Sequence, residues 1–161
     1  KKRVGLKSQI DGGKSTTTFR SGTPDLCAIL SINKALEIAL INQDERVKHV
    51  RKLNQLLRTQ LSQYKEVMIN STDYSIDHVL NISLMNIKAT DFVRMLDQHQ
   101  VYLSSKTSCC PTQTPSKMVY ALTQDRKRSL SSFRISLSHL TSEDEIKEFL
   151  TIFDQCYKEC L

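Results

Sequence analysis

Apolar residues recur at helical spacing through the first half of the chain. Two successive series follow it: Leu26, Ile29, Leu30, Leu36 and Leu40, then Val47, Val50, Leu53, Leu57 and Leu61. Steps of three and four residues put such side chains on one face of an α-helix, so we expect two long helices, or one that bends near Asn42. Thr23 suits the N-cap and Pro24 the first helical position, which predicts the start of the first helix. Before it, residues 4–10 predict a short strand and residues 11–23 a polar loop.

The second half has shorter segments, rich in β-branched and apolar residues and bounded by polar turns. Strands are expected over residues 67–71, 79–84, 101–104 and 132–138, and helices over 90–98 and 115–122. Thr141, with an acidic residue three positions later, resembles a capping box. It precedes an amphipathic final helix marked by Ile146, Phe149, Leu150, Phe153 and Tyr157. The predicted fold class is α+β: long helices followed by a small sheet with helices packed on one side.

Composition and charge narrow the class of protein. With 161 residues and 39% apolar content, the chain is long enough for an ordinary globular core. No window approaches eighteen uninterrupted apolar residues, and the first residues lack the apolar run of a signal peptide, so we expect no membrane partner. The net charge is +6, but the basic residues are scattered and aromatic residues do not interleave with them. We therefore expect no nucleic-acid partner, interpret the cluster Arg126-Lys127-Arg128 as a solvated loop, and note that a basic surface suits an acidic protein.

The five cysteines do not form the pattern of a disulfide framework, because two of them, Cys109 and Cys110, are adjacent and the count is odd. A reducing compartment is the simplest interpretation, so a cytoplasmic location is expected. Cys156 and Cys160 share one face of the final predicted helix. No histidine supplies further ligands at metal-site spacing, so no metal site is predicted.

Two loops carry candidate chemistry. Residues 20–24 read Arg-Ser-Gly-Thr-Pro, and a glycine, two hydroxyls and a helix start together resemble an anion-binding site, although capped helix starts are common. Cys109 lies in a polar loop three residues after Lys106, which would favour an accessible thiolate. A reactive thiol and an inert one remain open alternatives at this point.

The strand predicted over residues 132–138 carries a charge at its centre. Arg134 shares a face with Ser132 and Ser136, opposite the apolar Phe133 and Ile135. Its guanidinium is either solvated or placed to bind a carboxylate, which its planar fork suits.

Several ordered segments together resemble one family. They are Asp11-Gly12-Gly13 with Arg20 to Thr23, Leu80-Asn81-Ile82-Ser83, Ser104-Ser105 with Cys109, Arg134-Ile135-Ser136, and Thr141 to Ile146. In this order the chain resembles the carboxy-terminal half of a cysteine desulfurase, among the class V aminotransferase-like, pyridoxal phosphate-dependent enzymes of fold type I. The resemblance covers nearly the whole chain, and the ordered set is more specific than any single motif.

The resemblance implies roles for individual residues. Thr23, with Gly22, Ser21 and Arg20, would bind the phosphate of pyridoxal phosphate, usually that of the neighbouring subunit of a homodimer. Cys109 would take sulfur from L-cysteine, become a persulfide and release alanine. Arg134, together with Asn81, would bind the substrate. A sulfur-acceptor protein, and through it iron–sulfur cluster assembly, would receive the sulfur.

The resemblance also implies a division of the chain. Residues 1–23 would end the large cofactor domain, residues 24–62 would be long connecting helices, and residues 63–161 would be the small C-terminal domain with the cysteine loop. In this family the Schiff-base lysine directly follows a histidine, and no His-Lys pair occurs here. We therefore expect the chain to be part of a larger enzyme that neither binds the cofactor nor turns over alone. Alternatives are another class V aminotransferase, a selenocysteine lyase-like enzyme, or a non-catalytic sulfur-relay or binding module.

Overall fold

The computed structural model describes residues 5, 7–13, 20–105 and 114–160. The chain divides into two compact units, Lys1–Gln43 and Asp44–Leu161, and each is described by itself. The predicted boundaries at residues 23 and 62 remain a prediction.

The first unit contains one helix, α1 (Leu26–Ile41), none of whose residues is buried. The helix starts later than expected: Asp25 is its N-cap, and its carboxylate accepts a hydrogen bond from the Ala28 N–H at 3.0 Å. The prediction of Thr23 as N-cap is wrong because Asp caps a helix as well as Thr does, while Pro24 keeps the preceding residue extended. The strand predicted over residues 4–10 is also wrong for its described residues, 5 and 7–10, which pair with no other strand.

The second unit is built on a three-stranded antiparallel sheet in the order β1 (Val67–Ile69), β2 (Val79–Leu84) and β3 (Ser132–Ser136). Alternation along the strands makes its two faces different. One face is apolar and fully buried, with Leu80, Ile82 and Phe133 at its centre. The other face carries the polar side chains of Asn81 and Arg134, which lie directly opposite each other on β2 and β3.

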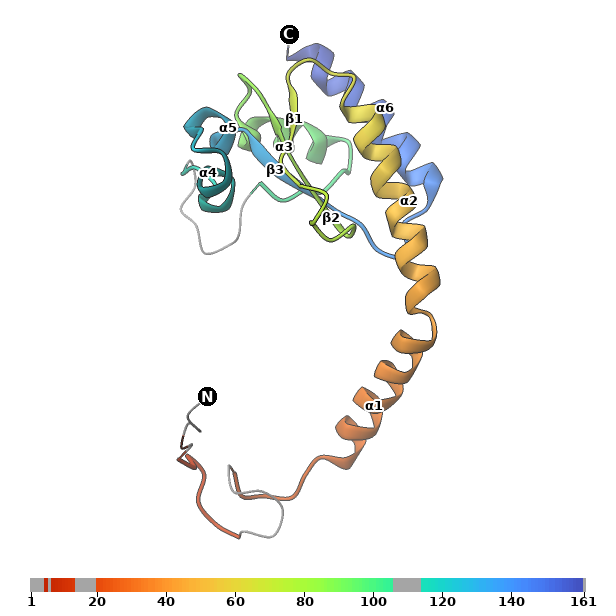
Figure 1. The fold of residues 1–161 in the computed structure, drawn as a ribbon, viewed down its shortest axis with the longest axis vertical. Helices are drawn as coiled ribbons and strands as arrows, with labels where there is room; N and C mark the ends of the chain where they lie inside the picture. The colour runs from red at the N-terminus through yellow and green to blue at the C-terminus, as the bar shows by residue number, and fades with distance from the viewer. Residues whose placement is uncertain (1–4, 6, 14–19, 106–113, 161) are drawn as a thin grey trace. The chain divides into compact units, whose positions relative to one another are not determined.

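Helices α2 (Gln43–Leu61), α3 (Ala89–Gln98) and α6 (Glu143–Glu159) contribute to the same core as the apolar face. Figure 1 shows α2 and α6 running side by side, and the Lys52–Glu143 ion pair at 2.7 Å joins them. Phe153 of α6 is fully buried, and its ring lies 5.2 Å from that of Phe92 of α3. Burying each such side chain contributes about 1.5–3 kcal/mol, so these helices hold the sheet in a fixed position.

Two short helices, α4 (Lys117–Thr123) and α5 (Arg126–Leu130), precede β3. The sequence predicted the first of them but not the second. The segment Arg126-Lys127-Arg128 lies in α5, so the prediction of a loop there is wrong, although Arg126 and Lys127 are exposed as expected. Asp125 caps α5, and the half-buried guanidinium of Arg128 donates a hydrogen bond to Asn70 at 2.6 Å.

Two smaller differences have local causes. The strand expected over residues 101–104 is reduced to a single bridge between Ser104 and Arg134, because the Val101 N–H instead donates to the Leu96 carbonyl at the end of α3. The capping box uses Ser142 and Glu145 rather than Thr141, whose hydroxyl accepts a hydrogen bond from the Ser138 N–H. Over the described residues no single helix is long and apolar enough to cross a membrane, although α1 and α2 taken as a bent pair have the length and composition.

Candidate functional site

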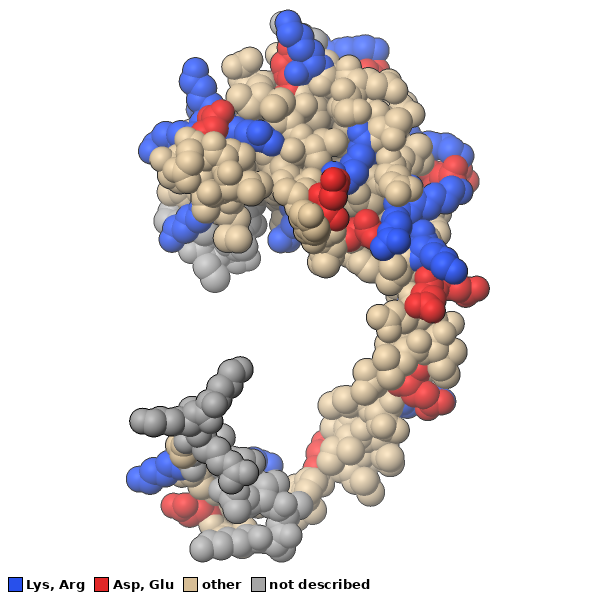
Figure 2. Space-filling model, viewed as in Figure 1, with Lys and Arg blue, Asp and Glu red and all other residues tan. Residues whose placement is uncertain are grey.

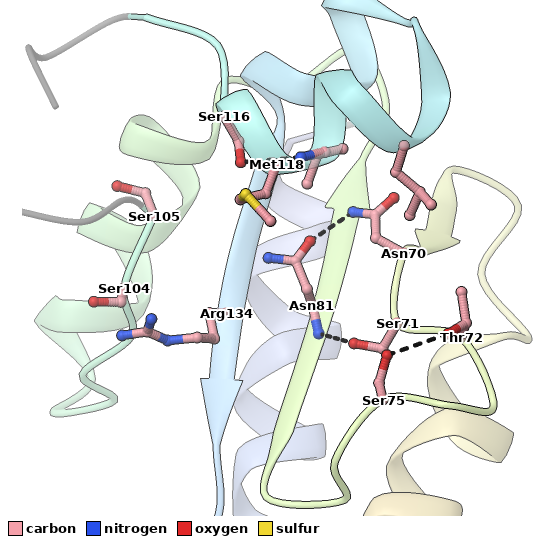
Figure 3. A pocket seen from close by; sticks show the side chains of 12 residues that line it. Asn70, Ser71, Thr72, Ser75, Asn81, Ser104, Ser105, Ser116, Met118 and Arg134 are labelled. Carbon is pink, nitrogen blue, oxygen red and sulfur yellow. Dashed lines mark hydrogen bonds between the residues drawn. The ribbon is translucent and has the colours of Figure 1, made fainter. Parts of the chain in front are cut away.

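The polar face of the sheet forms one wall of a cavity of about 400 Å³ (Figure 3). Its lining combines apolar surface with hydroxyls, two amides and one guanidinium. The lining residues are Asn70, Ser71, Thr72, Ser75, Asn81, Ser104, Ser105, Ser116, Met118, Val119, Leu122 and Arg134. Such a mixture, largely apolar with a few placed polar groups, is typical of small-molecule sites.

Arg134 is held in the middle of the cavity wall. Its backbone pairs with Asn81 on one side and with Ser104 on the other, where the Arg134 N–H donates to the Ser104 carbonyl at 2.8 Å. Its side-chain Nε is buried, and within the described part of the chain it has no hydrogen-bond partner. A buried donor left unpaired costs about 1–3 kcal/mol, so an acceptor that reached this nitrogen would stabilise the protein.

Asn81 lies beside Arg134, and its amide is held from behind. The Asn70 Nδ2 donates to the Asn81 Oδ1 at 2.7 Å, and the Asn81 backbone N–H donates to the Ser71 hydroxyl at 2.9 Å. Figure 3 shows the Asn81 oxygen turned toward Asn70 and the nitrogen turned away from it. The nitrogen end of this amide is therefore a second donor in the wall that contains Arg134.

Helix α4 supplies the apolar part of the lining with Met118, Val119 and Leu122. Ser116 caps this helix, accepting a hydrogen bond from the Val119 N–H at 3.4 Å, and its own N–H donates to the Ser129 carbonyl. The cap and this backbone bond keep α4 at the rim of the cavity. The arrangement suits a ligand with an anionic end and a short apolar end.

The loop with Cys109 and Cys110 lies outside the described residues, so the assignment of Cys109 as nucleophile stays a prediction. The residues on either side of the loop are informative. Ser105 precedes it, Ser116 follows it closely, and both line the cavity. Described residues on both sides of the predicted nucleophile thus line the same cavity as Arg134.

The predicted phosphate segment, Arg20 to Thr23, belongs to the first unit. The Ser21 hydroxyl already donates to the Asp11 carbonyl at 2.7 Å, and Gly22 has a φ of +112°, a conformation that favours glycine. The first turn of α1 is capped by the Asp25 carboxylate, which disfavours a second anion there. The cofactor role of these residues remains a prediction.

The structure brings together Arg134 and Asn81, as the resemblance implied, and adds residues that the sequence did not single out. Asn70 and Arg128 stand behind Asn81, and Met118 of α4 also lines the cavity. An amide directly after the apolar strand β1 was an available signal for Asn70. Nothing in the pattern linked Arg128 to it, because the two residues are far apart in sequence and meet only through the fold. Among the described residues no group of His, Cys, Asp or Glu is suited to a metal ion.

On the face of the second unit shown in Figure 2, basic side chains stand in separate groups, several beside acidic ones. Two ion pairs of this unit are Arg51–Asp77 at 3.0 Å and Lys158–Asp154 at 2.6 Å. Part of the basic charge is therefore balanced locally at the surface, where such pairs contribute little to stability.

Comparison with known proteins gives a consistent result. The sequence model of the family described as aminotransferase class V matches residues 2–149. The cysteine desulfurase IscS of Neisseria meningitidis serogroup A is 28% identical over 149 residues, which are 91% of this chain and 36% of that protein. The IscS of Anaeromyxobacter dehalogenans is 27% identical over 158 residues, covering 96% of this chain and 39% of that protein. A solved structure titled NifS-like protein has a TM-score of 0.80 and 26% identity, covering 98% of this chain and 40% of its own. The chain thus spans about two fifths of the length of these relatives.

Proposed function

This chain belongs to the aminotransferase class V family, and we propose that it acts as the substrate-binding and sulfur-accepting part of a cysteine desulfurase. The names of the relatives, cysteine desulfurase IscS and NifS-like protein, support the reaction. The cavity supports the substrate class, because its polar wall suits a carboxylate and its opposite wall suits a short, weakly polar side chain.

The observation that carries the proposal is the buried, unpartnered Nε of Arg134 beside the Asn81 amide. Both groups only donate at this wall, and a carboxylate only accepts. Hydrogen bonds between a guanidinium and a carboxylate are about twice as strong as neutral ones, which makes an amino-acid carboxylate the best-matched ligand. Arg134 would anchor it, and Asn81 would fix its orientation.

Cys109 is the proposed sulfur acceptor. Its thiolate would attack the sulfur of L-cysteine, forming an S–S bond while the bond between the substrate sulfur and Cβ breaks. The electron pair of that bond stays on Cβ, which takes up a proton to give alanine, and Cys109 is left as a persulfide. The position of Ser105 and Ser116 at the cavity supports this role, because they flank the Cys109 loop.

The family depends on pyridoxal phosphate in general, and that cofactor stabilises negative charge at substrate carbon atoms when it is bound. The described residues fit the substrate side of such a site rather than the cofactor side. We propose that this chain binds no cofactor by itself and is inactive alone. A homodimer, a cytoplasmic location and transfer of the persulfide sulfur to an acceptor protein belong to the same proposal.

A matched pair of ligands tests the carboxylate assignment in the 161-residue chain. L-cysteine and cysteamine differ only in the carboxylate, so L-cysteine should shift the amide signals of the cavity in an NMR titration and cysteamine should not. Arg134→Met should abolish the response, while Arg126→Met, which removes an exposed arginine of α5, should leave it unchanged. Equal binding of the two ligands would contradict the proposal.

A further inference from the structure

We propose that Arg128 orients the side-chain amide of Asn81, so that its N–H groups face the cavity and form a binding surface for a carboxylate. The inference rests on the proposed function, because it explains how that cavity recognises an acidic group. Arg128 is not among the residues that line the cavity. It is therefore a positioning residue, which acts through Asn70.

The side chain of Arg128 can only donate hydrogen bonds and never accept them. A guanidinium has only N–H donors, no acceptor, and stays charged at every relevant pH. The Nε of Arg128 donates to the Asn70 Oδ1 at 2.6 Å, and its Nη2 donates to the Ile69 carbonyl at 2.9 Å. Whatever faces these nitrogens must accept, so the oxygen end of the Asn70 amide is held toward Arg128.

The fixed orientation of the Asn70 amide determines in turn which atom of the Asn81 amide can face it. Asn70 lines the cavity but is buried, with 6% of its surface exposed, so little water competes for its amide. With its oxygen toward Arg128, its nitrogen points the other way and donates to the Asn81 Oδ1 at 2.7 Å and the Ser83 Oγ at 2.8 Å. Both N–H groups of the Asn70 amide are therefore used, one toward Asn81 and one toward Ser83. The Ser83 hydroxyl donates in turn to the Arg128 carbonyl at 2.8 Å, so the hydrogen bonds form a ring that returns to Arg128.

The orientation of Asn81 follows. Its oxygen must face the Asn70 nitrogen, so its own nitrogen faces the cavity, as Figure 3 shows. No described residue accepts a hydrogen bond from that nitrogen. Directly across the sheet stands Arg134, with its buried Nε likewise unpartnered within the described chain. The inverted Asn81 amide would present an oxygen to a bound carboxylate and repel it.

Two substitutions should change the orientation of the Asn81 amide in different ways. Arg128→Met removes the fixed donor, so the two amides can invert together and both orientations become populated. The affinity then falls in proportion to the competent fraction, about twofold or more. Asn70→Asp replaces the amide with a carboxylate, so that an accepting oxygen faces both Arg128 and Asn81. Asn81 must then turn its nitrogen toward the introduced carboxylate. The affinity should then fall about tenfold or more, the effect of losing a hydrogen bond to a charged group.

The experiment uses the ¹⁵N-labelled 161-residue chain, acetate as the probe, and two readouts for Asn81: the shift of its side-chain amide signals and their exchange with water. In wild type these signals should exchange rapidly and respond to acetate. In Asn70→Asp they should be protected and unresponsive. Arg128→Lys, which keeps a donor-only group, should behave like wild type, and so should Arg126→Met, which removes the same charge from the exposed side of α5.

The outcomes separate the two proposals. If Asn81 exchange is the same in wild type, Arg128→Met and Asn70→Asp, the positioning role is overturned whatever acetate does. If Asn70→Asp protects the Asn81 amide but acetate shifts no wild-type signal, the positioning role stands and the carboxylate assignment falls. If Arg128→Met does not fold, Asn70→Asp still decides, because it keeps the acceptor for Arg128.

Discussion

Replacing Asn81 with Asp should make this protein more stable and close its cavity to carboxylates. Asn81 and Arg134 are a directly opposed cross-strand pair, in which side chains of this length are within reach. One oxygen of the introduced carboxylate can keep the hydrogen bond from Asn70. The other can accept from the Arg134 Nε, the buried donor that has no partner within the described residues.

The size of the stabilisation follows from the missing hydrogen bond of the Arg134 Nε. Its missing hydrogen bond costs about 1–3 kcal/mol, and part of the recovered free energy offsets the desolvation of a half-buried carboxylate. We expect a net gain of about 1–2 kcal/mol in the free energy of unfolding. For a folded unit of this size, that is a rise in Tm of roughly 3–10 °C.

Thermal unfolding followed by circular dichroism at pH 7 measures this shift, and the acetate titration measures the loss of binding. Ser136→Asp is the matched control, because it adds the same charge at the exposed end of β3 without an unpartnered donor opposite it. The pairing lowers the folded-state pKa of the introduced carboxylate, so the gain should be present at neutral pH and disappear as the pH falls below about 4. A variant that is less stable than wild type, or that still binds acetate, would refute the reasoning.

Three further predictions concern other parts of the molecule. The Glu66 carboxylate that accepts a hydrogen bond from the Tyr157 hydroxyl raises the pKa of Tyr157 to about 12. Because the folded state holds this proton more tightly than the unfolded state, stability should fall as the pH rises from about 10 to 12, and denaturant titrations should show a smaller loss for Tyr157→Phe. Helix α1 is exposed and apolar, so sedimentation should show self-association of the full chain and a monomer for residues 44–161, whose core is complete. Cys109 should alkylate faster than Cys110 near neutral pH, and Lys106→Ala should slow it; equal rates at both cysteines in a mass-spectrometric assay would count against its role.

The secondary structure was largely readable from the chain, because helical and strand periods are local properties. The apolar series before and after Asn42 correspond to α1 and α2, and the final amphipathic series corresponds to α6. The caps were displaced by one or two residues where neighbouring residues cap equally well, as Thr23 and Asp25 do. Only the backbone geometry between them decided which one was used.

Part of the candidate site could be predicted from the sequence. Arg134 could be singled out because a charge in the middle of an alternating strand is unusual, and Asn81 because it shares the ordered motifs of a family. Arg128 could not be, since a basic residue in a charged cluster is solvated in most proteins. Its partner Asn70 lies 58 positions earlier in the chain.

The order of apolar and polar residues by itself determined that this chain forms long helices and then a small sheet with one apolar face, since each element needs only its own neighbours to form. The tertiary structure alone decided which polar groups meet on the other face, because hydrogen bonds between β1, β2 and α5 depend on how those elements pack. The amide that faces the cavity takes its direction from a guanidinium on another element. No local sequence pattern predicts the contact between that guanidinium and the amides.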